Sequence, residues 1–146
     1  MHHMDLRRQA QRAFTGLHSR VYRLTGGRIG RSMGSAEAIL LTTTGRKSGA
    51  QRTTPLTVVP DGKRLILIAS NGGAQKHPDW YLNLTANPEV RIQRGAAVQT
   101  MRARTAGPAE RQALWDRAVS IYSGYAGYQR KTEREIPVVV CEPVPA

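Results

Sequence analysis

Six short β-rich segments, separated by turns rich in glycine and proline, most constrain the fold of this 146-residue chain. They are expected at residues 39–44, 52–59, 65–69, 90–94, 98–105 and 136–142. Valine, isoleucine, leucine and threonine favour strands, whereas the intervening glycine and proline residues favour chain reversal. Sequential short strands with few helices predict antiparallel pairing in a closed or nearly closed barrel, not a doubly wound parallel sheet. The predicted fold class is therefore α+β and mainly β.

Local features add detail to this prediction. Residues 65–69 are continuously apolar, which predicts a strand buried on both faces. Pro55 interrupts the segment 52–59 and therefore indicates an edge or bulged strand. Residues 60–63 (Pro-Asp-Gly-Lys) have the composition of a hairpin turn. Helices are expected over 79–85, after a proline, and over 108–123, with one face formed by Leu114, Trp115, Ala118, Val119 and Tyr122.

The first 34 residues form a strongly basic segment. The whole chain has a formal net charge of +12, and seven arginines against Asp5 contribute +6 of it here. Apolar residues recur every three or four positions, which predicts an amphipathic helix that ends at Gly26-Gly27. This helix could pack on the domain or lie on an anionic membrane surface. We therefore divide the chain into a basic helix at 1–34 and a barrel domain at 35–146.

Several classes of protein are excluded by composition. No apolar run approaches the roughly 20 residues of a membrane span, and no signal peptide follows the basic start, so a cytoplasmic location is expected. The single cysteine, Cys141, excludes an internal disulfide, and no metal-ligand spacing is present. The basic segment lacks interleaved aromatic residues, so nucleic acid is not an expected partner. The oligomeric state is left open.

Two glycine-containing loops are candidate binding sites. Residues 45–49 (Gly-Arg-Lys-Ser-Gly), followed by Arg52, place three cations and free backbone N–H groups on one turn. This turn suits a phosphate or carboxylate, although a solvated hairpin has the same composition. Residues 70–74 (Ser-Asn-Gly-Gly-Ala) follow a buried strand and allow close approach of a ligand, or form a plain strand-to-helix turn.

Tyr122, Tyr125 and Tyr128 repeat at intervals of three and would share a helical face. Three phenols on one side can line an aromatic pocket and donate protons, with Trp80-Tyr81 extending the wall. Packing of the same rings into the core is the alternative. Gly124 and Gly127 indicate a looser segment here.

Several motifs in one order resemble the deazaflavin (F420)-dependent nitroreductase family of actinobacteria, which includes F420-dependent quinone reductases. The likeness extends over about residues 37–143. The motifs are 41–49 (LTTTGRKSG) with Arg52 and Pro55-Leu56, 69–74 (ASNGGA), 78–84 (PDWYLNL) with Asn87-Pro88, and the closing stretches 122–128 and 136–140.

This resemblance implies a split β-barrel, like that of FMN-binding flavoproteins, and transfer of a hydride from reduced F420 to a quinone-like or nitroaromatic acceptor. It assigns catalytic positions to Ser70, Tyr122, Tyr125 and Tyr128, and it raises the expectation of peripheral membrane contact. It assigns cofactor binding to Arg46, Lys47, Ser48, Gly49, Arg52, Pro55, Leu56, Thr57, Ala69, Ser70, Asn71, Gly72, Gly73, Ala74, Trp80 and Asn83. Asn71 and Thr57 depart from residues common in relatives. The alternatives are an FMN-binding reductase on the same barrel and a non-enzymatic lipid- or anion-binding module.

Overall fold

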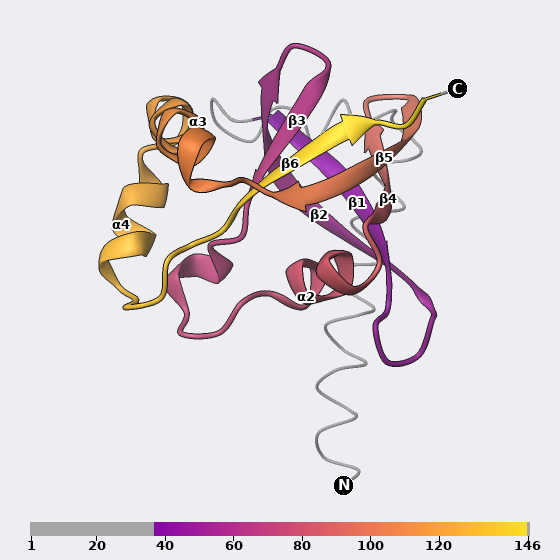
Figure 1. Cartoon of the computed structure of the whole chain (residues 1–146), viewed down its shortest axis with the longest axis horizontal. Helices are drawn as coiled ribbons and strands as arrows, with labels where there is room; N and C mark the ends of the chain where they lie inside the picture. The colour runs from indigo at the N-terminus through magenta and orange to yellow at the C-terminus, as the bar shows by residue number, and fades with distance from the viewer. Residues whose placement is uncertain (1–36, 146) are drawn as a thin grey trace, which may run out of the picture.

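The computed structural model describes residues 37–145, which form a six-stranded barrel with helices at its side and lower end (Figure 1). The elements in chain order are β1 (Glu37–Thr44), β2 (Gln51–Asp61), β3 (Arg64–Ile68), the 3-10 turn η2 (Asn71–Gly73), α2 (Asp79–Ala86), β4 (Glu89–Arg94), β5 (Ala97–Thr105), α3 (Pro108–Ile121), α4 (Gly124–Arg130) and β6 (Val138–Pro143). Each of the six predicted strands is present.

The strands close in the order β1-β2-β3-β6-β5-β4, and every neighbouring pair is antiparallel. The prediction of a barrel is therefore confirmed. Pro55 lies opposite Leu40 of β1, in a part of β2 that has no strand on its other side. A residue without a backbone N–H is tolerated at such an edge, as the sequence predicted.

Two apolar clusters explain why β3 is buried on both faces. Leu65 and Leu67 face the barrel interior, together with residues such as Ile39 and Met101. The alternate residues Ile66 and Ile68 face outward and pack in a second cluster with residues of α3 and α4. Successive side chains of a strand point to opposite faces, so a continuously apolar strand is apolar on both. One face of β3 packs in the barrel interior and the other is covered by the helices.

The predicted end of the helix at Ser123 is two residues too late. Helix α3 ends at Ile121, and Tyr122 adopts an extended conformation with φ of −139°. The chain then forms α4 despite the glycines at 124 and 127. The β2–β3 turn is also shifted: Pro60 pairs with Leu65 inside the ladder, and Gly62, with φ of 61°, begins the two-residue loop. The expected basic helix at 1–34 lies outside the described residues.

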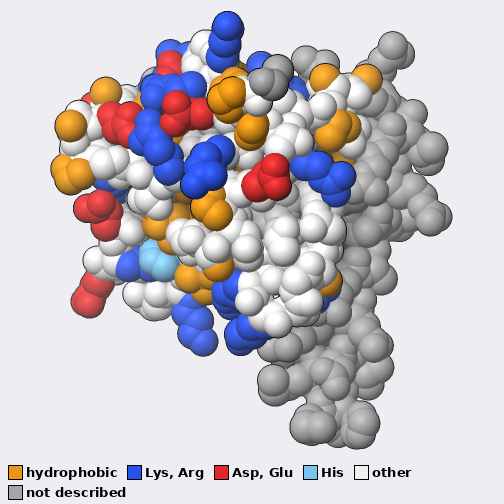
Figure 2. All heavy atoms as spheres, turned by 45° about the vertical axis from the view of Figure 1, so that its right-hand side comes forward, with side chains coloured by type: hydrophobic (Ala, Val, Ile, Leu, Met, Phe, Trp, Pro, Cys, Tyr) orange, Lys and Arg blue, Asp and Glu red, His pale blue; other side chains and the backbone are white. Residues whose placement is uncertain are grey.

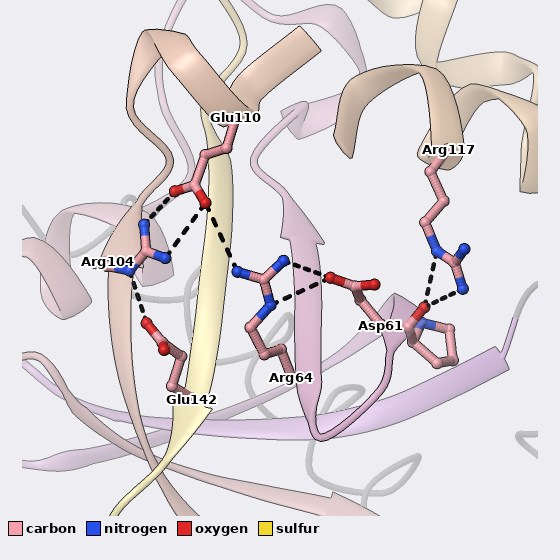
Figure 3. Close-up of polar contacts among 7 residues, drawn as sticks. Asp61, Arg64, Arg104, Glu110, Arg117 and Glu142 are labelled. Carbon is pink, nitrogen blue, oxygen red and sulfur yellow. Dashed lines mark hydrogen bonds and ion pairs between the residues drawn. The ribbon is translucent and has the colours of Figure 1, made fainter. Parts of the chain in front are cut away.

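A network of ion pairs joins the β2–β3 hairpin to the start of α3 (Figure 3). Arg64 contacts Asp61 at 2.5 Å and Glu110 at 3.6 Å, while Arg104 pairs with Glu110 and with Glu142, the latter at 2.7 Å. Acidic and basic side chains accordingly lie side by side near the top of the described surface in Figure 2. The positive charges of Arg64 and Arg104 are thus compensated locally by three carboxylates.

Candidate cofactor site

The barrel separates between β2 and the chain that follows β3. Strand β2 pairs with β3 only over Val59–Asp61, whereas it pairs with β1 from Gln51 to Val58. The other edge of β2 over 51–58 therefore has no strand partner among the described residues. Pro55 and Thr57 alternate with the interior-facing residues and lie on the outer face, whereas Leu56 packs against the interior cluster. The outer face of β2 can therefore serve as the floor of a groove.

The β1–β2 turn holds the predicted anion-binding residues at one end of β2. Backbone bonds close it, with Gly49 N donating to Gly45 O at 2.8 Å and Gly45 N donating to Ala50 O at 2.8 Å. Lys47, Ser48 and Arg52 are exposed. Neither Lys47 nor Arg52 forms an ion pair with another described residue, so both positive charges remain available to an anionic ligand.

Arg46 differs from its neighbours because it is bound to α2. Its Nη1 donates to Asn83 Oδ1 at 2.9 Å, its backbone N donates to the same oxygen at 3.2 Å, and its Nη2 lies 3.3 Å from Asp79 Oδ1. Asn83 is buried and also donates to Thr43 Oγ1 at 3.3 Å. These contacts give Arg46 and Asn83 a role in fixing the turn on α2.

The loop after β3 is compact and conformationally unusual. Asn71, Gly72 and Gly73 have φ angles of 47°, 63° and 84°, all in the left-handed region. Asn71 Nδ2 donates to Lys76 O at 3.0 Å and closes the loop, while Ser70 is buried. A Cβ added to Gly73 would lie 2.9 Å from Tyr128 O, so only glycine permits this contact with α4.

The three predicted tyrosines meet, although not on one helical face. The Tyr122 and Tyr125 rings are 4.9 Å apart, and the Tyr122 and Tyr128 hydroxyls are 3.0 Å apart. Tyr125 is buried, and its hydroxyl lies 2.5 Å from Thr57 Oγ1. Burial raises the pKa of Tyr125, and the hydrogen bond with Tyr128 raises the pKa of Tyr122. The phenols of Tyr122 and Tyr125 thus favour their protonated form.

Trp80 does not extend this aromatic cluster. It lies on α2, partly buried against the barrel-interior cluster, with Tyr81 in an edge contact at 6.4 Å between centroids. Tyr125 and Tyr128 instead belong to the outer cluster. The two aromatic groups therefore pack against different layers of the protein, and the predicted continuous wall is not formed.

Arg134 is a residue that the sequence did not single out. Its guanidinium contacts the carbonyl oxygens of the 69–74 loop and also His77 Nδ1, at 2.9 Å. No local motif surrounds Arg134, and it acts on residues about sixty positions earlier in the chain. Only the folded structure brings it to the loop.

The family can now be stated from comparison with known proteins. A family model described as F420H(2)-dependent quinone reductase matches residues 15–143. The chain belongs to this family. A curated relative, an F420H(2)-dependent quinone reductase of Mycobacterium tuberculosis, is 41% identical over 128 residues, which are 85% of this chain and 86% of the relative.

Solved structures agree with this assignment. An F420-H2 dependent reductase, FDR-A, matches with a TM-score of 0.67 and 45% identity, covering 72% of this chain and 93% of that one. A heme storage protein from Vibrio cholerae matches at a TM-score of 0.54 and 12% identity over 75% of this chain and 82% of its own, which shows the fold alone.

The family establishes the class of chemistry. The F420H(2)-dependent quinone reductases are oxidoreductases that use the deazaflavin coenzyme F420, and the predicted resemblance, enzyme class and cofactor are confirmed. The split β-barrel is confirmed as well. Among the described residues, no helix is long and apolar enough to cross a membrane.

Proposed function

We propose that this protein binds F420 along the outer edge of β2 and reduces a quinone at the tyrosine end of that groove. The observation that carries the proposal is the separation of β2 from β3 beyond Val59, because it leaves a strand edge beside a loop with three left-handed residues. Pro55 and Thr57 would form the floor, and the 69–74 loop would form the opposite side.

The length of the groove supports a cofactor with chemically different ends. Arg52 lies at the turn, and Thr57 lies five residues further along β2 at the tyrosines. An extended strand rises about 3.3 Å per residue, so these positions are separated by roughly 17 Å. Because side chains alternate along a strand, Arg52 lies on the face opposite Thr57, so a ring system at Thr57 would send its anionic tail around the open edge of β2 to the cationic turn.

The turn would hold the anionic part of the cofactor. Lys47 and Arg52 are exposed cations without ion pairs in the described part of the chain. Backbone hydrogen bonds keep the turn that carries Lys47 closed, and Arg52 follows it at the start of β2. Arg46 would act by orienting the turn, because Asn83 and Asp79 already occupy its guanidinium. Charge-assisted hydrogen bonds to a phosphate are the strongest polar contacts that such a turn can provide.

The opposite end would hold the ring and the acceptor. The backbone N–H groups of Ser70 and Asn71 can donate to ring oxygens, and Gly72 presents no Cβ to open space beside them. When bound, reduced F420 supplies a hydride. The protein positions the two rings and excludes water from between them.

Tyr122 and Tyr128 are the better candidates for contact with the acceptor. Tyr122 is 37% exposed, and its hydroxyl is paired with that of Tyr128, so one O–H remains free to donate outward. Tyr125 is only 4% exposed and is bound to Thr57, which makes it a positioning residue. Ser70 would border the same groove. A nitroaromatic would occupy the same position as a quinone.

The proposed role of the β1–β2 turn predicts that loss of one of its cations weakens F420 binding. Lys47→Ala should raise the Kd for F420 about tenfold, equivalent to about 1.4 kcal/mol, because it removes a charge-assisted contact. Lys63→Ala removes the same charge from the two-residue β2–β3 loop and is the matched control. Fluorescence titration with F420 at two salt concentrations measures both variants.

The outcomes separate the proposals. If the Lys47 and Lys63 variants bind F420 with equal affinity, the turn is not part of the cofactor site. Wild-type protein that fails to restore the deazaflavin absorption when mixed with reduced F420 and menadione would overturn the proposed activity. Copurification of FMN without F420 binding would favour the FMN-using alternative.

We further propose a cytoplasmic location with contact between the basic N-terminal segment and the membrane surface. The sequence pattern of residues 1–34, with a net charge of +6 and regularly spaced apolar residues, supports this proposal. Cosedimentation with anionic liposomes should be lost when residues 1–33 are deleted, while reduction of a water-soluble quinone persists. Equal cosedimentation of both forms would contradict it.

A further inference from the structure

Arg134 contacts the 69–74 loop from the side of its carbonyl groups. Its Nη2 donates to Ser70 O at 2.8 Å, and its Nε donates to Ala74 O at 2.9 Å. Nη1 and Nη2 each lie 3.3 Å from Ala69 O. One guanidinium thus binds three carbonyl oxygens, which lie at the start and the end of the loop.

This arrangement determines where the amide hydrogens of the loop point. The peptide bonds of the described chain are trans, and in a trans peptide the C=O and the following N–H point in opposite directions. The N–H groups of Ser70, Asn71 and Gln75 therefore point away from Arg134. None of these three N–H groups donates to another described residue, so they are available to a ligand.

The side chain of Arg134 is held by His77, and its backbone is held by Gln129. Its Nη1 lies 2.9 Å from His77 Nδ1, and burial followed by the charge of Arg134 lowers the pKa of His77. The neutral ring can then accept the hydrogen bond. Gln129 Nε2 donates to the backbone oxygen of Arg134 at 2.8 Å, while Gln129 Oε1 accepts from Ile136 N at 2.9 Å. Arg134 is consequently presented to the loop in one orientation.

A second contact connects the same segments. Thr132 Oγ1 and Gln75 Oε1 are 2.9 Å apart, and Gln75 Nε2 donates to Lys131 O at 3.3 Å. This contact attaches the loop to the end of α4 without using the carbonyl groups that Arg134 binds. Loss of the guanidinium would therefore free the carbonyl groups of Ala69 and Ala74, whereas Ser70 O keeps its bond from Gly73 N at 2.9 Å and the loop remains attached.

We propose that Arg134 is a positioning residue for cofactor binding: by binding the carbonyl oxygens of Ala69, Ser70 and Ala74, it directs the loop amides toward the F420 ring. This inference rests on the proposed binding of F420 beside the 69–74 loop. Arg134 touches the loop from behind and acts through the backbone. Lysine cannot replace it, because an ammonium lacks the planar fork of donors that reaches several carbonyls at once.

The experiment compares Arg134→Lys with Arg111→Lys in the full-length protein. Arg111 is a matched control, because its Nη2 also donates to a backbone carbonyl, that of Ile136 at 2.8 Å, and it does not contact the loop. Measurements are the Kd for F420 by fluorescence titration, kcat and KM for reduced F420, the Tm, and amide hydrogen exchange at residues 70–75.

The expected result is selective. Arg134→Lys should raise the Kd and the KM for F420 at least tenfold, leave kcat at saturating cofactor within about twofold, and speed exchange of the loop amides. Arg111→Lys should leave the Kd unchanged, even where its Tm falls equally. Such a split would not arise from a general loss of stability.

Each other result overturns a distinct statement. If wild-type protein binds F420 and Arg134→Lys binds it equally well, the positioning role is wrong and the proposed function stands. If both variants weaken binding to the same extent, the effect is global and the positioning role is again wrong. If wild-type protein does not bind F420, the proposed function fails, and the role of Arg134 fails with it.

Discussion

Gly73→Ala should destabilise the protein for two reasons: an unfavourable backbone conformation and a steric clash of the new Cβ with residues at the end of α4. A second variant separates the two contributions. The φ angle of Gly73 is 84°, and an L-residue in the left-handed region costs about 1–2 kcal/mol. The added Cβ would also lie 2.9 Å from Tyr128 O and 3.0 Å from Lys131 Cβ. Backbone atoms yield less readily than the tip of a side chain, and such overpacking costs about 1–3 kcal/mol. The expected total is about 2–5 kcal/mol.

The neighbouring Gly72 provides the matched control. Its φ is 63°, and a Cβ added there would have no heavy atom within 4 Å, so Gly72→Ala should show only the backbone cost. The difference between the variants is about 1–3 kcal/mol, which corresponds to a Tm roughly 3–9 °C lower for Gly73→Ala in a chain of this length.

Thermal unfolding followed by circular dichroism measures both variants. Equal Tm values for Gly72→Ala and Gly73→Ala would refute the reasoning, because they would mean that α4 moves away from the loop without cost. That result would also weaken the inference on Arg134, since Lys131 and Thr132 of the same turn attach the loop to α4.

Two further substitutions test other contacts. Tyr125→Phe should lower the free energy of unfolding by about 1 kcal/mol, because it removes the partly buried hydrogen bond to Thr57. Tyr122→Phe should leave stability unchanged and lower quinone turnover. The reverse pattern in unfolding and kinetic assays would exchange the roles of the two tyrosines. Glu110→Gln should cost at most about 1 kcal/mol, because its ion pairs are partly exposed. The Arg104 guanidinium lowers the pKa of Glu110, so this contribution is full above the ordinary carboxyl pKa of 4.5 and is lost as the pH falls through the lower folded-state value. A Tm difference from wild type that persists in acid, or that equals the difference for the exposed Glu89→Gln, would contradict this expectation.

The strands and the family could be predicted from the sequence because both depend on local order along the chain. The apolar run at 65–69 must be covered on both faces wherever it lies, and Pro55 excludes a central position for its part of β2. Glycine-containing turns divide the segments, and the order of the motifs identifies the family. These signals need no knowledge of distant contacts.

The site itself depends on contacts between distant residues. A charged turn looks the same in sequence whether its arginine is free or bound, and only the fold shows that Arg46 is held by Asn83 while Lys47 is exposed. Tyr122, Tyr125 and Tyr128 have equal spacing, yet the end of α3 at Ile121 leaves one phenol buried and another exposed.

The clearest difference concerns the loop after β3. Its glycines are evident from the sequence and predict close approach of a ligand. Gly73 N binds Ser70 O within the loop, but the Ala69 and Ala74 carbonyls have no partner there, and Arg134, about sixty residues later, binds them and so helps to set the direction of the amides. The sequence by itself thus determined the strands and the class of chemistry, and the tertiary structure decided which groups are free to perform it.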